Sequence, residues 1–103
     1  MAKTYWIARV DLHGDAETYK KYVQTATPAF ERHKAKFLAR GGKTEVLEGK
    51  ARARNIVLEF KDHATALACY RSPEYAKAKA LRAGAVDIDI IVIEGYDGPQ
   101  PTD

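Results

Sequence analysis

The sequence predicts a ferredoxin-like α+β fold, in which the elements follow the order βαββαβ and form a four-stranded antiparallel sheet. Strand-like runs rich in branched and aromatic residues lie near both ends of the chain, at Tyr5–Leu12 and Ile88–Ile93. Helical runs occur at about residues 15–34 and 62–83, and two further strand-like runs lie between them. Because crossover connections are right-handed, both helical regions should cover the same face of the sheet.

The length and composition indicate one globular domain. A chain of 103 residues is typical of a single domain, which we assign to residues 1–96, followed by a frayed tail at 97–103. Apolar residues make up 46% of the chain and charged residues 30%, a balance that argues against disorder.

The charge and the single cysteine limit the classes of partner. The net charge of +3 comes from basic residues scattered among acidic ones, so we expect no nucleic-acid partner. Cys69 is the only cysteine, which excludes an intramolecular disulfide and fits a reducing cytoplasm. The sequence shows neither a signal peptide nor an apolar run of membrane-spanning length, so we expect a cytoplasmic protein without a membrane partner.

The first helix is expected to begin at Asp15, whose carboxylate suits a helix N-cap. Its apolar stripe recurs every three or four positions, at Tyr19, Tyr22, Val23, Ala26, Phe30 and His33. Pro28 lacks a backbone donor, so it should kink this helix or restart it near Thr27.

The two middle strands should pair as a hairpin. The second strand is predicted to run from Phe37 to Glu48, with a β-bulge or bend at Gly41–Gly42. The third strand, Arg54–Phe60, follows a short loop and should therefore be antiparallel to the second.

The second helical region should consist of two segments. Asp62 is a candidate N-cap for the first, and Ser72–Pro73–Glu74 combines a serine cap, a proline at the first position and an acid near the positive helix end. Gly84 should end the second segment.

The last strand carries apolar residues on both faces in its second half. Asp87 and Asp89 alternate with apolar residues, but Ile91 and Ile93 then follow on the same face as the aspartates. Tyr5, Ile7 and, by parity, Val57 should share this face. Because the helices cover only the other face, this patch would be exposed, and we predict a homodimer in which two sheets pack face to face.

His33 is the candidate catalytic residue. It ends the apolar stripe of the first helix near the Arg40–Gly41–Gly42 bend, and an ordinary histidine pKa of about 6.5 suits a general acid or base. A buried histidine that only packs fits the same pattern. Cys69 is predicted to be a buried structural thiol.

Tyrosines and arginines are the candidate ligand-binding residues: Tyr19, Tyr22, Tyr70, Tyr75, Arg40, Arg54 and Arg82. Tyrosine hydroxyls orient small polar ligands in apolar clefts, and arginine binds carboxylates through two hydrogen bonds. The tyrosines fit equally into a core, and the arginines into ion pairs with Glu48, Glu59 or Glu74. Glu59 itself should face the dimer side and would need a partner such as Arg9. Ile88, Ile90 and Val92 would form the floor of the pocket.

Several strings in the sequence form a recognisable set. They are Arg40–Gly41–Gly42, Glu45–Val46–Leu47–Glu48–Gly49, Arg54, Glu59–Phe60, Tyr70–Arg71–Ser72–Pro73–Glu74–Tyr75, Arg82 and Glu94–Gly95. Together they resemble the family called domain of unknown function 1330, within the dimeric α/β-barrel superfamily, over about residues 4–96. The resemblance implies a ferredoxin-like protomer that dimerises through its sheet, but it implies no activity. One departure is Lys34–Ala35, where the family tends to carry glycine.

The sequence supports two interpretations of function. In the first, a homodimer binds a small organic molecule, a carboxylate being one option, between helices and sheet; for an enzyme, the superfamily suggests cofactor-free isomerase or monooxygenase-like chemistry. In the second, the protein binds a ligand or assembles without catalysis. His13, His33 and His63 lack metal-ligand spacing, and no phosphate loop or dinucleotide fingerprint occurs, so we expect no metal and no cofactor.

Overall fold

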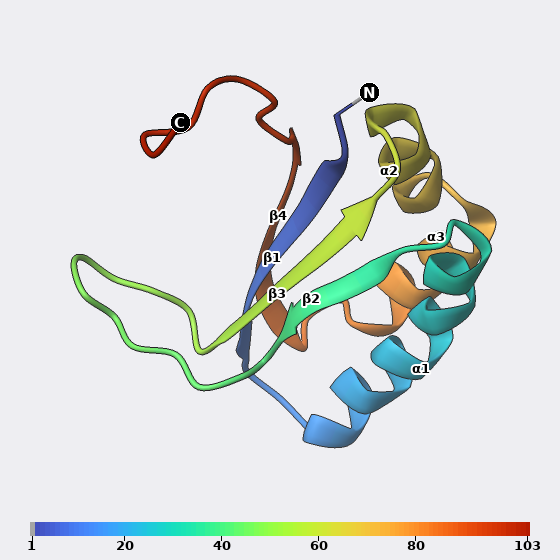
Figure 1. The fold of residues 1–103 in the computed structure, drawn as a ribbon. Coiled ribbons are helices and arrows are strands. Elements are labelled where there is room, and N and C mark those ends of the chain that lie inside the picture. The colour runs from blue at the N-terminus through green and yellow to red at the C-terminus, as the bar shows by residue number, and fades with distance from the viewer. Residues whose placement is uncertain (1) are drawn as a thin grey trace.

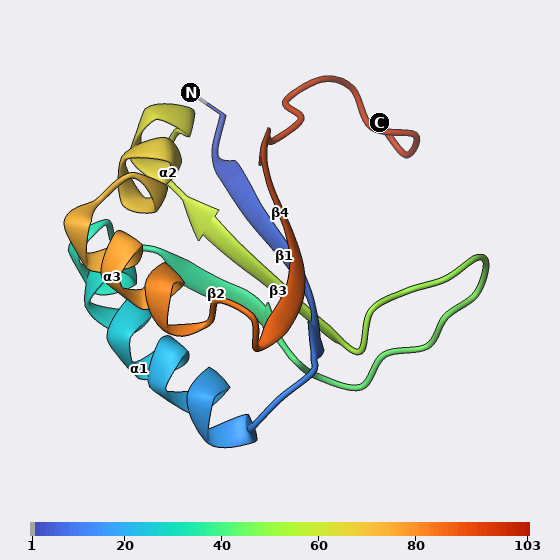
Figure 2. The ribbon, with the colours of Figure 1, turned by 180° about the vertical axis from the view of Figure 1, so that it is seen from behind.

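The computed structural model describes residues 2–103 and has a ferredoxin-like α+β fold. Its elements are β1 (Thr4–Leu12), α1 (Ala16–Arg32), β2 (Lys36–Arg40), β3 (Arg54–Phe60), α2 (His63–Tyr70), α3 (Pro73–Leu81) and β4 (Val86–Glu94). The strands form one antiparallel sheet in the order β2-β3-β1-β4. The helices cover one face of this sheet and leave the other open, as predicted (Figures 1 and 2). No helix among the described residues is long and apolar enough to cross a membrane.

The helices begin where the sequence predicts. Asp15, Asp62 and Ser72 each accept a hydrogen bond from a backbone N–H of the first turn, which satisfies a donor that the helix leaves unpaired. Helix α1 is continuous through Pro28 and does not restart near Thr27, whose hydroxyl instead donates a hydrogen bond within the helix.

Helix α1 ends in a Schellman motif. The backbone N–H groups of Lys34 and Ala35 donate to the carbonyls of Glu31 and Phe30, and Lys34 has a φ of 56°. Lys34 therefore adopts a left-handed conformation that glycine would adopt without strain.

Strand β2 is much shorter than predicted. It ends at Arg40, and residues 41–53 form an exposed loop that extends beyond the sheet (Figures 1 and 2). The β-bulge lies between Phe37 and Ala39, whereas at Gly41 the chain makes a bend, the other predicted possibility. Gly41 has a φ of 68°, a left-handed conformation that turns the chain out of the sheet.

The residues before β3 are bound elsewhere, which explains why the hairpin stops at Arg40. Asp11 on β1 accepts hydrogen bonds from the backbone N–H of Ala53 and from the Arg52 side chain. Arg52 also binds Asp89 on β4. These bonds draw the end of the loop over the open face of the sheet, away from β2.

The open face of the sheet is apolar at the end away from Asp11 and Asp89. Ile7 on β1 lies between Val57 and Ile91 in the strand register. Ile91 and Ile93 are 55% and 49% exposed, as the sequence predicts for this patch. Glu59 also lies on this face, but its partner is Lys3, at 3.2 Å, and the predicted pairing with Arg9 is wrong.

Trp6 is the centre of the core between helices and sheet. It is 1% exposed, and its ring centroid lies 5.1 Å from that of Tyr75 and 5.7 Å from that of Tyr70. Phe30 and Phe60 pack against it at 5.5 and 6.0 Å. Burying an aromatic side chain of this kind contributes about 1.5–3 kcal/mol to folding.

Candidate functional site

A cavity of about 130 Å³ lies between α1 and the helix-facing side of the sheet, and we call it the α1 cavity. Its apolar lining includes Trp6, Val10, Phe30, Phe37, Ile56 and Leu58. Its polar lining consists of Tyr19, Tyr22, Thr27, Arg40 and Arg54. Among the described residues, no carboxylate, histidine or cysteine lines it.

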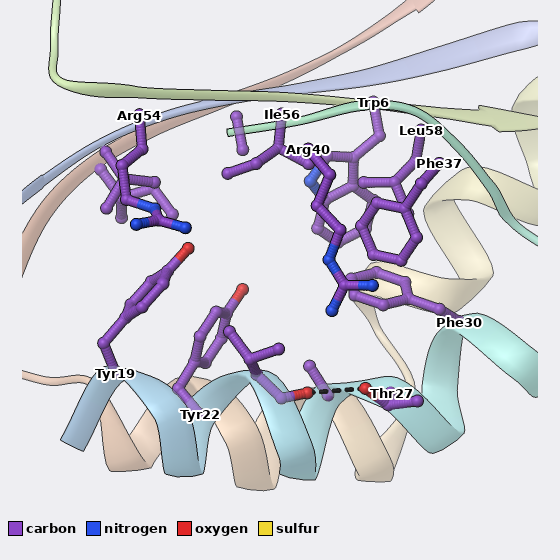
Figure 3. A pocket seen from close by; sticks show the side chains of 15 residues that line it. Trp6, Tyr19, Tyr22, Thr27, Phe30, Phe37, Arg40, Arg54, Ile56 and Leu58 are labelled. Carbon is purple, nitrogen blue, oxygen red and sulfur yellow. Dashed lines mark hydrogen bonds between the residues drawn. The ribbon is translucent and has the colours of Figure 1, made fainter. Parts of the chain in front are cut away.

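The polar groups of the α1 cavity come from two sides. Arg40 on β2 and Arg54 on β3 extend from the sheet, while Tyr19 and Tyr22 extend towards them from α1 (Figure 3). The guanidinium carbon of Arg40 lies 4.2 Å from the centroid of the Phe37 ring, and that of Arg54 lies 5.5 Å from the Tyr19 ring. Aromatic faces thus hold both cations in place.

The ion pairs that were the alternative for these arginines do not form. Glu59 pairs with Lys3 and Glu74 with Arg32. Within residues 2–103, Arg40 and Arg54 form no ion pair with an acidic side chain. Both arginines therefore present positive charge at the mouth of the α1 cavity without an internal counter-ion.

Gly41 makes room for one of these arginines. A Cβ atom at Gly41 would lie 3.1 Å from Nη2 of Arg54, so the guanidinium lies directly across the glycine. The Arg40–Gly41 string therefore supplies one arginine of the cavity and the space for the second.

The tyrosine hydroxyls are neutral at ordinary pH. The Tyr22 hydroxyl lies 2.7 Å from the Tyr75 hydroxyl, and burial, together with this neighbour, raises the pKa of Tyr22 well above its usual value. Burial also raises the pKa of Tyr19, although the charge of Arg54 opposes this effect. Both groups can therefore orient a ligand through hydrogen bonds but are poor bases.

The predicted site residues do not form a single site. Tyr22, Arg40 and Arg54 line the α1 cavity, whereas Tyr70 and Arg82 line a second hollow of about 570 Å³. We call this hollow, bounded by α2, α3 and β4, the β4 cleft. Tyr75 is fully buried and lines neither, but its hydroxyl contacts Tyr22 and, at 3.5 Å, Nη2 of Arg82.

The predicted floor of the pocket is divided in the same way. Ile88 lines both hollows, whereas Ile90 and Val92 line only the β4 cleft. The helix-facing side of β4 is thus mainly the floor of the second hollow.

His33 lies outside both hollows. It is the C-cap residue of α1, and its Nδ1 lies 2.8 Å from the carbonyl oxygen of Ala29. Its catalytic role therefore stays a prediction that no contact with a cavity supports. Cys69 is buried, and burial, with a smaller effect of the Glu74 charge, raises the pKa of its thiol to about 12, as suits a structural cysteine.

Sequence reasoning missed Thr27 and Phe37 as lining residues and Gly41 as the support of Arg54. Thr27 lies one turn after Val23 on the apolar stripe, a spacing that could have identified it. The position of Phe37 depends on the bulge in β2, which has no comparable signal in the sequence.

The fold and the α1 cavity define a small ferredoxin-like α+β protein with a cavity between its long helix and its sheet. The chain belongs to the family described as Domain of unknown function (DUF1330), whose model matches residues 3–96. The family predicted from the sequence strings is therefore confirmed. No curated protein matches the sequence significantly.

Solved structures share this fold. A protein of unknown function from Rhodopseudomonas palustris is 23% identical, with a TM-score of 0.76 over 94% of this chain and 85% of that one. A dimeric ferredoxin-like protein of unknown function from Jannaschia is 14% identical, with a TM-score of 0.71 over 90% and 99% of the two chains. SnoaB from Streptomyces nogalater, a cofactor-independent oxygenase, is 12% identical, with a TM-score of 0.63 over 98% and 99%. These identities support similarity of fold alone.

Proposed function

We propose that the protein binds a small organic anion in the α1 cavity, with the acid group at Arg40 and Arg54 and the apolar body inside. The observation that carries this proposal is the pair of arginines, both without an acidic partner in residues 2–103, at the mouth of an aromatic cavity. Guanidinium groups bind carboxylates through paired hydrogen bonds, and no acidic side chain of the lining competes for them.

The size of the cavity limits the ligand. A dry cavity of about 150 Å³ holds one benzene molecule in an engineered protein, whereas drug-sized ligands need roughly 300–1,000 Å³. At about 130 Å³, the α1 cavity fits a compact body of about one ring. We therefore infer that the ligand is a one-ring or short-chain acid.

Benzoate is a suitable probe, and benzamide is its neutral counterpart of nearly the same shape. Trp6 is the only tryptophan and lines the cavity, so its fluorescence and its indole N–H signal in NMR report binding directly. We expect saturable binding of benzoate, with benzamide at least about tenfold weaker, which corresponds to about 1.4 kcal/mol.

The Arg54→Gln variant should weaken benzoate binding at least about tenfold, because it removes one of the two positive charges at the mouth. Lys20→Gln, on the exposed side of α1, is the matched control and should bind benzoate normally. Equal affinities for benzoate and benzamide, or equal losses in the two variants, would contradict the proposal.

A cofactor-independent oxygenase is the second candidate function. SnoaB shares the fold, and the arginines of the α1 cavity would favour an ionised, electron-rich substrate that reacts with dioxygen directly. The lining supplies hydrogen-bond donors but no ready base, so the substrate would have to enter as an anion. Oxygen uptake with a phenolate that binds the cavity, abolished in Arg54→Gln, would support this function over binding alone.

We also propose that two copies associate through the open face of the sheet. The row of Val57, Ile7 and Ile91 supports this, as do the dimeric states described for the proteins from Jannaschia and Thermobifida fusca. Sedimentation equilibrium should show a dimer at micromolar concentration and a monomer for Ile91→Lys. Leu81→Lys, at an exposed apolar site on α3, should remain dimeric. A monomeric wild-type protein would rule out this assembly.

A further inference from the structure

We propose that the β4 cleft is a second, independent binding site that takes a medium-chain acyl carboxylate, with its head group at Arg82 and Lys79 and its chain along β4. The cleft shares only Ile88 with the lining of the α1 cavity and has a volume of about 570 Å³.

The charge of the lining selects an anion. His63, Arg71, Lys79 and Arg82 line the cleft, and no acidic side chain of the described residues does. Three of these side chains belong to residues that are always charged at neutral pH. A neutral ligand would leave this concentration of positive charge uncompensated.

Arg82 is the strongest single indication that the cleft suits an anion. It is only 8% exposed, and its Nε has no hydrogen-bond partner. Within residues 2–103 it forms no ion pair, and its contacts are a long hydrogen bond to Tyr75 and the face of the Tyr22 ring at 5.2 Å. A buried charge normally has a paired counter-ion, because desolvation without one is strongly unfavourable. An anionic head group in the cleft would supply that counter-ion.

The floor of the cleft selects an extended apolar body. Ile88, Ile90 and Val92 point to the same side of β4 because side chains alternate along a strand. At about 3.3 Å per residue, these three cover about 13 Å, which is close to the extended length of a chain of about ten carbons. Arg82 precedes this strip by a short connection, so the charged end lies near Ile88 and the chain runs towards Val92.

Decanoate, used well below its micelle concentration, is the probe, and decanol is the neutral comparison. Calorimetry and backbone amide NMR on the full chain should show one saturable site for decanoate, with shifts at Ile90 and Val92, which line the cleft but not the α1 cavity. We expect decanol to bind at least tenfold more weakly. Equal binding of decanol, or no saturable binding of decanoate, would overturn the proposal.

Variants separate the β4 cleft from the α1 cavity. Arg82→Gln should abolish decanoate binding, and because Arg82 is buried, Lys79→Gln and Ile90→Glu provide tests at more exposed positions. Each should weaken decanoate at least fivefold, whereas Lys77→Gln, on the same helix but outside the cleft, should not. Equal losses in Lys79→Gln and Lys77→Gln would contradict the assignment.

Arg54→Gln should leave decanoate affinity unchanged, and benzoate should not compete with decanoate. Loss of decanoate in Arg54→Gln, or competition between the two probes, would place decanoate in the α1 cavity and overturn the second site. Failure of benzoate to bind would contradict the proposed function of the α1 cavity but not this inference.

Discussion

The α1 cavity and the β4 cleft occupy the same layer between helices and sheet, yet they differ in almost every property that matters for binding. The α1 cavity is small, its walls are aromatic, and its arginines come from two neighbouring strands. The β4 cleft is larger, its floor is aliphatic, and its basic groups come from α2, α3 and the residues that follow each helix. Trp6 lines the α1 cavity and packs against Tyr75, whose hydroxyl contacts Tyr22 of that cavity and Arg82 of the cleft. The same layer therefore holds two hollows with different linings, which share Ile88.

The largest expected effect comes from removing the Trp6 ring, and it is an effect on stability. Trp6→Ala deletes a core ring that packs against four aromatic neighbours, and such a change costs about 3–5 kcal/mol. For a chain of this size, we expect the melting temperature to fall by roughly 15–30 °C. Thermal unfolding followed by circular dichroism measures this. Tyr96→Ala, which removes a ring that is 68% exposed, should change the melting temperature little, and an equal loss in both variants would contradict the central role of Trp6.

Tyr75→Phe tests the hydrogen bonds of the Tyr75 hydroxyl and should have the next largest effect on stability. The variant keeps the ring but leaves the buried hydroxyl of Tyr22 without its partner and Arg82 without its hydrogen bond. We expect a loss of about 1–3 kcal/mol in the free energy of unfolding, measured with urea. Tyr70→Phe removes a hydroxyl that meets only the exposed Lys79 side chain, so it should cost less than about 0.5 kcal/mol. A Tyr75 variant as stable as that control would show that the hydroxyl contributes nothing.

Gly41→Ala should affect one site and spare the other. The new methyl group would meet the guanidinium of Arg54 at 3.1 Å, and the left-handed conformation costs alanine about 1 kcal/mol. We expect weaker benzoate binding, by about threefold to tenfold, and unchanged decanoate binding. Titration of the variant with each probe checks this.

Two other glycines of the loop separate the causes of that effect. Gly49 has a similar φ, 71°, but open space around it, and Gly42 has neither a positive φ nor a close neighbour. Gly49→Ala should therefore show the backbone strain without the loss of benzoate, and Gly42→Ala should show neither. If Gly49→Ala lost benzoate as strongly as Gly41→Ala, contact with Arg54 would not be the cause.

Local chemistry explains what the sequence could predict. Asp15, Asp62 and Ser72 specify helix starts because capping depends on a few adjacent residues. The alternation in β4 and β1 identifies the buried and the exposed face of the sheet for the same reason. Tyr22, Arg40 and Arg54 could be named as candidate binding residues because of their side-chain chemistry, and the structure brings all three to the α1 cavity.

The features that the sequence could not predict depend on contacts between segments that are distant in the chain. The length of β2 is limited by bonds from Asp11 to the end of the loop, which no local pattern reveals. In the sequence, Arg82 is a candidate ligand-binding residue of the same kind as Arg40 and Arg54. In the structure it lines the β4 cleft, whereas the other two arginines line the α1 cavity. The packing of the core thus determines which candidate residues line the same hollow.

His33→Gln should have the smallest effect of all. His33 lines neither hollow, and its ring meets only the carbonyl at the end of its own helix among the contacts within hydrogen-bond distance. Glutamine can donate the same hydrogen bond, so we expect a stability change within about 0.5 kcal/mol and benzoate and decanoate affinities within a factor of two. The measurement that matters most is oxygen uptake with a bound phenolate. If that activity occurs and His33→Gln abolishes it while binding is intact, His33 acts as the base after all and the α1 cavity must extend to the end of α1 when occupied.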